Sequence, residues 1–204
     1  MRASSINIQL ASRYSNLMMP LEGIRVLDLS RILAGPHAAQ SLSDLGADVI
    51  KVEAPWGDDS RTWGPPFQQG FDGGEVASYF LSCNRGKKIV FANLKNERER
   101  VRSLMDTVDV VIENFKPGAF DRLLGPVKPD LIVCSISGYG QEGPRRDEPA
   151  FDLTMQARSG IMSVTGEEDG PPAKVGVAWI DVMTGMNAVS SIPVSYTHLR
   201  AHET

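Results

Sequence analysis

The chain has 204 residues, of which 42% are hydrophobic and 23% are charged, and its formal net charge is -4 at pH 7. Its ordinary apolar content argues against a disordered chain, and its acidic balance argues against the basic face that non-specific binding of nucleic acid requires. No run approaches the ~20 consecutive apolar residues of a membrane-spanning helix, so we expect neither a nucleic acid nor a membrane as a partner.

Residues 1–18 contain arginine and serine but no acidic residue. This composition fits an organelle-targeting leader, and it equally fits an upstream extension before a start at Met18 or Met19. We therefore expect a cytoplasmic protein, or a protein of the mitochondrial matrix if residues 1–18 are a transit peptide.

Apolar segments and helical periodicities alternate along the middle of the chain. Strands are expected at residues 24–29, 48–53, 88–94, 109–113 and 130–136, and helices at residues 37–46, 96–107 and 118–124. Strands that alternate with helices indicate βαβ units, and continuous apolar strands indicate a sheet covered on both faces. The predicted fold class is α/β, with a Rossmann-like parallel sheet and helices on both faces.

Ligands of open α/β sheets bind beyond the carboxyl ends of the strands. Four loops rich in Gly, Pro, Arg, Asn or Trp are therefore candidate binding segments: residues 30–36, 54–74, 114–118 and 137–149. Residues 54–74 form the longest of them and show no internal period, which is typical of a functional loop.

Arg85, Lys87 and Lys88 precede the third predicted strand. Such side chains either hold phosphate groups or solvate the edge of a sheet. Histidine is scarce, since only His37 lies before the last seven residues. Because zinc sites and Ser-His-Asp triads need histidine, we expect no metal site.

The loop from Gly138 to Gly143 matches the G-x-G-x-x-G pattern directly after a predicted strand. A dinucleotide fingerprint must open a helix, whereas Pro144 follows here and helical periodicity resumes only near Asp152. We therefore assign no nicotinamide or flavin site to this loop, and a nucleotide-binding dehydrogenase that uses it is kept as the alternative from a different class.

Asp181 stands out among the carboxylates, because it lies among apolar residues at the start of a helical pattern. From the residues alone it is either a helix cap or a nucleophile strengthened by desolvation. Asp152, which follows Phe151 in a similar setting, has the same two interpretations.

The end of the chain differs in composition from what precedes it. The helical pattern is expected to stop at Pro193. Residues 193–204 carry no periodicity that would dock on a core, and we interpret them as a non-native tail, with a genuine short polar tail as the alternative. The domain would then span residues 19–192 and continue in a longer protein.

Six segments, taken together and in this order, resemble the class III CoA-transferase family. They are residues 21–29 (LEGIRVLDL), 33–36 (LAGP), 44–53 (DLGADVIKVE), 84–88 (NRGKK), 113–118 (ENFKPG) and 138–144 (GYGQEGP). The resemblance covers residues 20–192 almost continuously and implies the N-terminal part of the large domain of such an enzyme.

The resemblance implies a CoA-transferase that moves CoA from an acyl-CoA donor to a carboxylic acid. Asp181 matches the catalytic carboxylate, which forms a covalent aspartyl intermediate. The positions that match CoA contacts are Arg31, Ile32, Ala34, Arg85, Lys88, Asn114, Phe115 and Arg122, and those around the acyl and carboxylate pocket are Trp63, Tyr79, Phe151 and Asp152. The family also implies an interlocked homodimer, with a CoA thioester as substrate and no tightly bound cofactor.

Two positions and one segment refine this expectation. Ala54 stands where relatives often carry a CoA-contacting arginine, and Phe151 stands where the racemase branch carries a catalytic histidine. The absence of this histidine argues against racemisation and for transfer, and an acyl-CoA racemase of the same fold is the second interpretation. Residues 57–67 most resemble the succinyl-CoA–glutarate branch, which favours a dicarboxylic acceptor. A further hypothesis is that this chain is an inactive N-terminal fragment.

Overall fold

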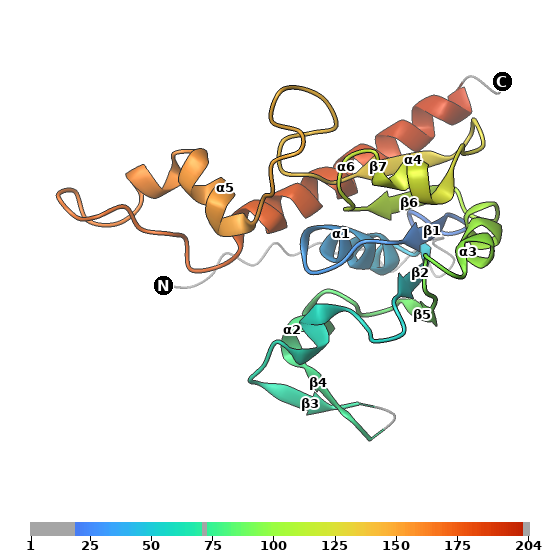
Figure 1. Ribbon diagram of the computed structural model, residues 1–204, viewed down its shortest axis with the longest axis horizontal. Coiled ribbons are helices and arrows are strands. Elements are labelled where there is room, and N and C mark those ends of the chain that lie inside the picture. The colour runs from blue at the N-terminus through green and yellow to red at the C-terminus, as the bar shows by residue number, and fades with distance from the viewer. Residues whose placement is uncertain (1–18, 71–72, 202–204) are drawn as a thin grey trace, which may run out of the picture.

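The computed structural model describes residues 19–70 and 73–201, and its centre is a five-stranded parallel sheet (Figure 1). The strands are β1 (Arg25–Asp28), β2 (Asp48–Glu53), β5 (Lys88–Phe91), β6 (Val110–Glu113) and β7 (Ile132–Ser135), in the order β5-β2-β1-β6-β7. The chain winds outward from β1 through β2 to β5, and then crosses to the other side of β1 for β6 and β7. This doubly wound order confirms the predicted α/β class.

Helices cover both faces of the sheet, because neighbouring strand residues point to opposite sides. On one face, α1 (Ala34–Asp44) and α6 (Trp179–Ala201) pack over Val26 and Val110. On the other face, α3 (Arg98–Met105) and α4 (Ala119–Leu124) pack over Leu27 and Val111. Within residues 19–70 and 73–201, no helix combines the length and the apolarity needed to cross a membrane.

Below the carboxyl end of β1 lies a buried cluster of charged side chains. The Nζ atom of Lys51 is 2.8 Å from the carbonyl oxygen of Ser30, 3.2 Å from Asp58 and 3.8 Å from Asp28. Lys87 donates to Asp28 at 2.8 Å. Burial alone would raise the pKa of Asp28, but the charges of Lys87 and Lys51 bring this pKa below its ordinary value. The cluster therefore ties the loop after β1 to the sheet.

The predicted strands and helices are confirmed with shifted ends. Helix α1 begins at Ala34 rather than at residue 37, because Pro36 fits the first turn of a helix, where its missing N–H group needs no partner. Strand β5 ends at Phe91 rather than at residue 94, because the carbonyl of Asn93 accepts hydrogen bonds from Asn96 and Glu97 and turns the chain.

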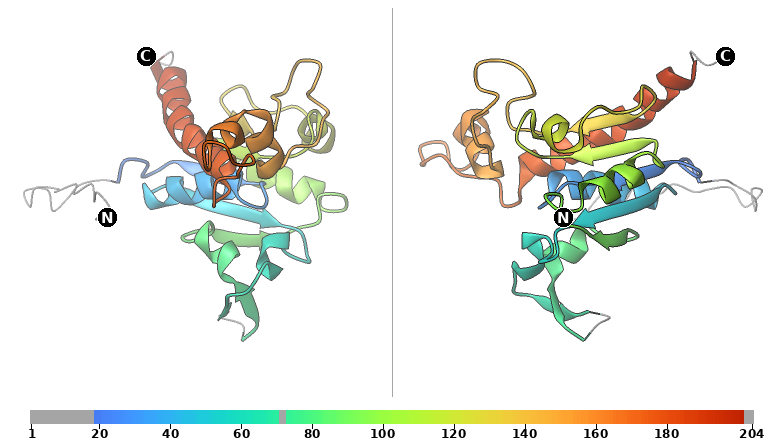
Figure 2. Two further views of the ribbon diagram at one scale, coloured as in Figure 1. Left: turned by 90° about the vertical axis from the view of Figure 1, so that its left-hand side faces the viewer. Right: turned by 45° about the vertical axis from the view of Figure 1, so that its right-hand side comes forward.

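The segment of residues 54–74, expected to be one long loop, contains short elements. A 3₁₀ helix η1 (Asp59–Thr62) is followed by the antiparallel hairpin of β3 (Phe67–Gln69) and β4 (Glu75–Ala77), and α2 (Ser78–Ser82) follows directly. The hairpin projects away from the main sheet (Figure 2). Elements of three to five residues are too short to show a period, which explains why the sequence did not reveal them.

After β7 the chain leaves the sheet before it returns in α6. It forms α5 (Asp152–Arg158) and the 3₁₀ helix η2 (Ile161–Val164), and α5 lies beside the start of α6 (Figure 1). The segment between β7 and α6 is therefore held mainly by the contacts that α5 makes with α6.

The expectation that the helix stops at Pro193 is wrong, because α6 continues to Ala201 with Pro193 inside it. A proline removes one backbone donor, and the helix resumes beyond it with Thr197 donating its hydroxyl to the carbonyl of Pro193 at 2.9 Å. Ile192 is the last buried residue of α6. The interpretations of residues 1–18 as a leader and of residues 202–204 as part of a non-native tail lie outside the described residues.

Replacing the buried lysine should destabilise the fold far more than replacing an exposed one. Lys51→Met leaves Asp58 without its buried cation and Asp28 with Lys87 alone, and a broken buried pair typically costs about 3–5 kcal/mol. Lys88→Met removes the exposed ion pair with Asp48 and should cost less than about 1 kcal/mol. Urea unfolding of both variants at pH 7 measures the difference, and equal losses would contradict a structural role for the buried cluster.

Candidate active site

Asp181 lies in the first turn of α6 and is half-buried. Burial, and after it the negative charge of Asp152, raises the pKa of Asp181 to about 6. The carboxylate is therefore mostly ionised at neutral pH although it has lost part of its hydration. Weak hydration makes such a group a better nucleophile than an exposed aspartate.

The phenol of Tyr79, on α2, shares the electrostatic environment of Asp181. Burial first, and then the charge of Asp181, raises the pKa of Tyr79 to about 12, so the hydroxyl keeps its proton at neutral pH. The ring of Trp63 meets the ring of Tyr79 edge-on, with centroids 5.4 Å apart. The structure therefore brings Trp63, Tyr79 and Asp181 together, although they are far apart in the sequence.

The two other pocket residues expected from the sequence lie at the start of α5. Asp152 accepts hydrogen bonds through Oδ1 from the backbone N–H groups of Ile180 at 2.7 Å and Asp181 at 3.2 Å. It therefore caps α6 from a neighbouring helix, whereas its own helix α5 has no side-chain cap. Phe151 precedes it and is 76% exposed.

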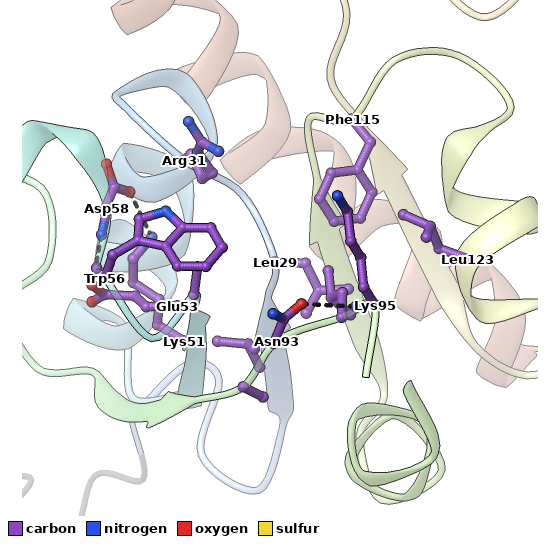
Figure 3. Close-up of a pocket in the computed structure, with 15 residues that line it drawn as sticks. Leu29, Arg31, Lys51, Glu53, Trp56, Asp58, Asn93, Lys95, Phe115 and Leu123 are labelled. Atoms are coloured by element: carbon purple, nitrogen blue, oxygen red, sulfur yellow. Dashed lines mark hydrogen bonds and ion pairs between the residues drawn. The ribbon is translucent and has the colours of Figure 1, made fainter. Parts of the chain in front are cut away.

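A second feature, a cavity of about 230 Å³, opens at the carboxyl edge of the sheet (Figure 3). Arg31 and Trp56 lie on one side of it, and Lys95 and Phe115 on the other. These four side chains follow β1, β2, β5 and β6, so the cavity lies where the winding of the sheet reverses. Doubly wound folds bind their ligands at this place.

The loop after β1 connects the cavity to α6. Asn114 fixes its first part, since it accepts from the N–H of Arg31 at 3.0 Å and donates to the carbonyl of Arg31 at 2.9 Å. Ile32 adopts a φ of 73°, and its N–H lies 3.3 Å from Asp58. At the other end, a Cβ atom on Gly185 of α6 would lie 2.8 Å from the carbonyl oxygen of Ala34. The loop from Arg31 to Ala34 therefore runs from the cavity to the helix that carries Asp181.

Of the eight residues matched to CoA contacts, Arg31 and Phe115 line this cavity. The other six do not: Ile32, Ala34, Arg85, Lys88, Asn114 and Arg122. Arg85 pairs with Asp44 at 2.6 Å, and Lys88 pairs with Asp48 at 2.6 Å. Lys88 is the first residue of β5, so both pairs lie at the amino edge of the sheet, away from the cavity. Arg122 is exposed on α4 beside Leu123, which does line the cavity. The assignment of Arg85 and Lys88 to CoA phosphates stays a prediction.

Sequence reasoning missed Trp56, Asn93 and Lys95 as lining residues of the cavity. Lys95 donates its N–H to Asn93 at 3.0 Å in the turn that ends β5. Their place in the chain could have revealed Asn93 and Lys95, because residues that follow a parallel strand lie at the carboxyl edge of the sheet. The apolar pattern instead predicts a strand that continues to residue 94 and includes Asn93.

The loop from Gly138 to Gly143 opens no helix in the structure. Turns follow Gly143, and α5 begins only at Asp152. The geometry that places a pyrophosphate on a helix N-terminus is therefore absent from this loop. Among residues 19–70 and 73–201, no cluster of three or more His, Cys, Asp or Glu side chains could hold a metal ion.

Comparison with known proteins places these features in a family. The sequence model described as CoA-transferase family III matches residues 21–204. The succinate–glutarate CoA-transferase of Agrobacterium fabrum is 49% identical over 193 residues, which are 90% of this chain and 48% of that protein. The succinyl-CoA:glutarate CoA-transferase of Mus musculus is 46% identical, over 86% of this chain and 41% of that protein.

The fold agrees with a solved structure of the same kind. The crystal structure of a CAIB/BAIF family protein from Brucella suis superimposes with a TM-score of 0.86 at 48% identity, and the match covers 91% of this chain and 50% of that chain. The chain therefore spans about half the length of the curated relatives it matches.

Neutralising Asp181 should stabilise the folded protein at neutral pH. The pKa of this carboxyl group is about 6 in the folded state against 3.8 as its ordinary value, so its ionisation opposes folding as the pH rises through this interval. Asp181→Asn should raise the free energy of unfolding at pH 7.5 by about 1 kcal/mol, a figure reduced for partial solvent screening. Urea unfolding should show little gain at pH 4.

The control for this measurement is Asp169→Asn, in the exposed loop between α5 and α6. It removes the same charge from the surface and should leave the free energy of unfolding unchanged at both pH values. A gain for Asp181→Asn that does not depend on pH would refute the linkage to its ionisation.

Proposed function

The chain belongs to CoA-transferase family III, and on this premise we propose that the complete protein moves CoA from an acyl-CoA to a carboxylic acid through Asp181. The observation that carries the proposal is the half-buried carboxylate of Asp181, whose pKa is about 6. Such a group is ionised at neutral pH and only partly hydrated, as covalent catalysis by a carboxylate requires.

In the proposed chemistry the carboxylate of Asp181 acts first as the nucleophile and at the end as the leaving group. It attacks the thioester carbonyl carbon of the donor, forms a C–O bond and expels the CoA thiolate, which leaves a mixed anhydride. The thiolate then attacks the aspartyl carbonyl carbon and releases the donor as a free carboxylate. The resulting aspartyl-CoA thioester reacts with the acceptor carboxylate through the same two steps in reverse, which frees Asp181 and yields the new acyl-CoA.

The cavity at the carboxyl edge supports a place for the nucleotide end of CoA. Lys95 supplies positive charge for phosphate groups, and so does Arg31, which pairs with the exposed Asp59. The indole of Trp56, which is 71% exposed, offers a face on which an adenine can stack. Relatives often carry a CoA-contacting arginine at the position of Ala54. In this chain the indole of Trp56, two residues further on, can make the contact with the adenine instead. The extended arm of CoA would follow the loop from Arg31 to Ala34 toward Asp181.

We further propose a dicarboxylic acid as acceptor. The support comes from the relatives that act between succinate and glutarate and from the resemblance of residues 57–67 to that branch. Phe151 cannot exchange a proton, which disfavours a racemase.

The proposed assembly of the complete enzyme is an interlocked homodimer. Met186 and Val194 on α6 are 53% and 54% exposed, and an interface would cover these apolar side chains.

The complete protein should form a covalent adduct at Asp181. Incubation with succinyl-CoA, followed by peptide mass spectrometry, should show a peptide bearing Asp181 with the mass of an aspartyl-CoA thioester, and Asp181→Asn should show neither adduct nor transfer to glutarate. Transfer at the wild-type rate by Asp181→Asn would refute the assignment. The matched control is Asp169→Asn, which should keep both the adduct and the activity.

Lys95→Ala should weaken the binding of acyl-CoA, because it removes a cation from the cavity. The loss of one charge-assisted hydrogen bond corresponds to an increase of KM for acyl-CoA of about tenfold or more, with kcat nearly unchanged. Arg85→Ala is the comparison, since this side chain pairs with Asp44 at the opposite edge of the sheet and should change KM by less than about twofold. The opposite ranking would place the phosphates of CoA at Arg85.

A further inference from the structure

Gln156 is a buried polar side chain on α5 that no part of the proposed chemistry uses. It is 1% exposed, and every polar atom of its amide group has a partner. Its Oε1 accepts from the N–H of Val175 at 2.8 Å, and its Nε2 donates to the carbonyl of Val177 at 3.2 Å and to Oδ2 of Asp152 at 2.5 Å. Gln156 therefore holds the segment that leads into α6 against α5.

Asp152 continues this set of contacts to the nucleophile. While Oδ2 accepts from Gln156, Oδ1 accepts from the backbone N–H groups of Ile180 and Asp181. Both oxygens of Asp152 are thus engaged with the protein. One connected set of hydrogen bonds runs from residues 175–177 through Gln156 and Asp152 to the first turn of α6, and we name Gln156 and Asp152 together the α6 clamp.

We propose that the α6 clamp positions Asp181 for attack, so that Gln156 and Asp152 are positioning residues rather than contacts of the substrate. The proposal rests on the proposed function of Asp181. It follows from the place of α5, which lies beside the start of α6 and away from the main sheet (Figure 1). Helix α1 packs against α6 one turn further on, at Gly185, whereas Asp152 holds the backbone N–H groups of Ile180 and Asp181 directly. The clamp therefore sets the position of the first turn, and displacements of about 1 Å can cost a hundredfold in rate.

The clamp also places a charge next to the nucleophile. The titratable groups that face Asp181 are Asp152 from α5 and Tyr79 from α2, while His37 of α1 lies one turn further along α6, against Gly185. Of these, Asp152 supplies the negative charge that opposes ionisation of Asp181. Removing that charge should therefore move the pH dependence of attack to lower pH, whereas a side chain with a purely structural role would not move it.

The first test compares Asp152→Asn with the unchanged complete enzyme. The introduced amide keeps the size of the side chain but offers one acceptor oxygen to three donors, so kcat should fall about tenfold to a hundredfold, with KM for both substrates within about threefold. The acidic limb of the kcat profile should shift to lower pH. Unchanged kcat with an unshifted limb would overturn the proposal, and so would a rise confined to KM for the acceptor, which would make Asp152 a substrate contact.

The second test reverses the polarity of the clamp. Gln156→Glu turns a carboxylate toward the carboxylate of Asp152 and should also lower kcat, whereas the double variant with Asp152→Asn lets the new amide donate to the new carboxylate. The double variant should recover at least about tenfold of the kcat lost in Gln156→Glu, and no recovery would overturn the proposal. The control for the added charge is Ser103→Glu, at an exposed position of α3, which should leave kcat unchanged.

Hydrogen exchange separates this proposal from the proposed function, because it needs no activity. In Asp152→Asn the amides of Ile180 and Asp181 should exchange at least about tenfold faster, while those of α1 stay protected. Unchanged protection at both amides would overturn the clamp even in an active enzyme. A wild-type protein that forms no adduct and transfers no CoA would instead refute the function of Asp181, whatever the exchange data show.

Discussion

The buried charges below the carboxyl end of β1 are the constraint on which the rest of the structure depends. The side chains of Asp28, Lys51 and Lys87 are fully buried, and each cation is within 4 Å of Asp28. Removing such groups from water costs several kcal/mol per ion, which only well-placed partners can offset. The partners include the backbone, since Lys51 donates to the carbonyl of Ser30 and Lys87 to that of Pro36. The charges are therefore satisfied only when the loop between β1 and α1 has its present shape.

The conformation of this loop in turn fixes parts of the cavity and of the site around Asp181. Asp58 accepts from the N–H of Ile32 and lies 3.2 Å from Lys51, so it connects the loop after β2 with the loop after β1. Glu53 extends the connection, since it accepts from Asp58 N at 2.9 Å and binds Arg61 with both of its oxygens. One wall of the cavity and the N-terminus of α1, against which α6 packs, are consequently fixed by a single network.

The sequence revealed the features that depend on local pattern and not those that depend on distant contacts. Continuous apolar segments revealed the five strands, and Asp181 among apolar residues revealed the start of α6. The strands β3 and β4 are too short to show a period. Helix α6 continues through Pro193, although a proline is expected to end a helix. Gln156 looked like an ordinary polar residue of a helix, because its partners at Val175 and Val177 lie about twenty positions further along the chain. By contrast, the strand predicted at residues 88–94 already places Lys88 and Lys95 at opposite edges of the sheet.

The environment of Asp181 balances two opposing requirements of a carboxylate nucleophile. Burial reduces its hydration and strengthens it as a nucleophile, but burial and the charge of Asp152 both raise its pKa. A pKa of about 6 leaves the group ionised at neutral pH, whereas a deeper position would leave it protonated and inert. The N-terminus of α6 opposes further protonation, because its backbone N–H groups favour negative charge. A carboxylate held in this balance needs no histidine to activate it, and the scarcity of histidine in the chain is consistent with such chemistry.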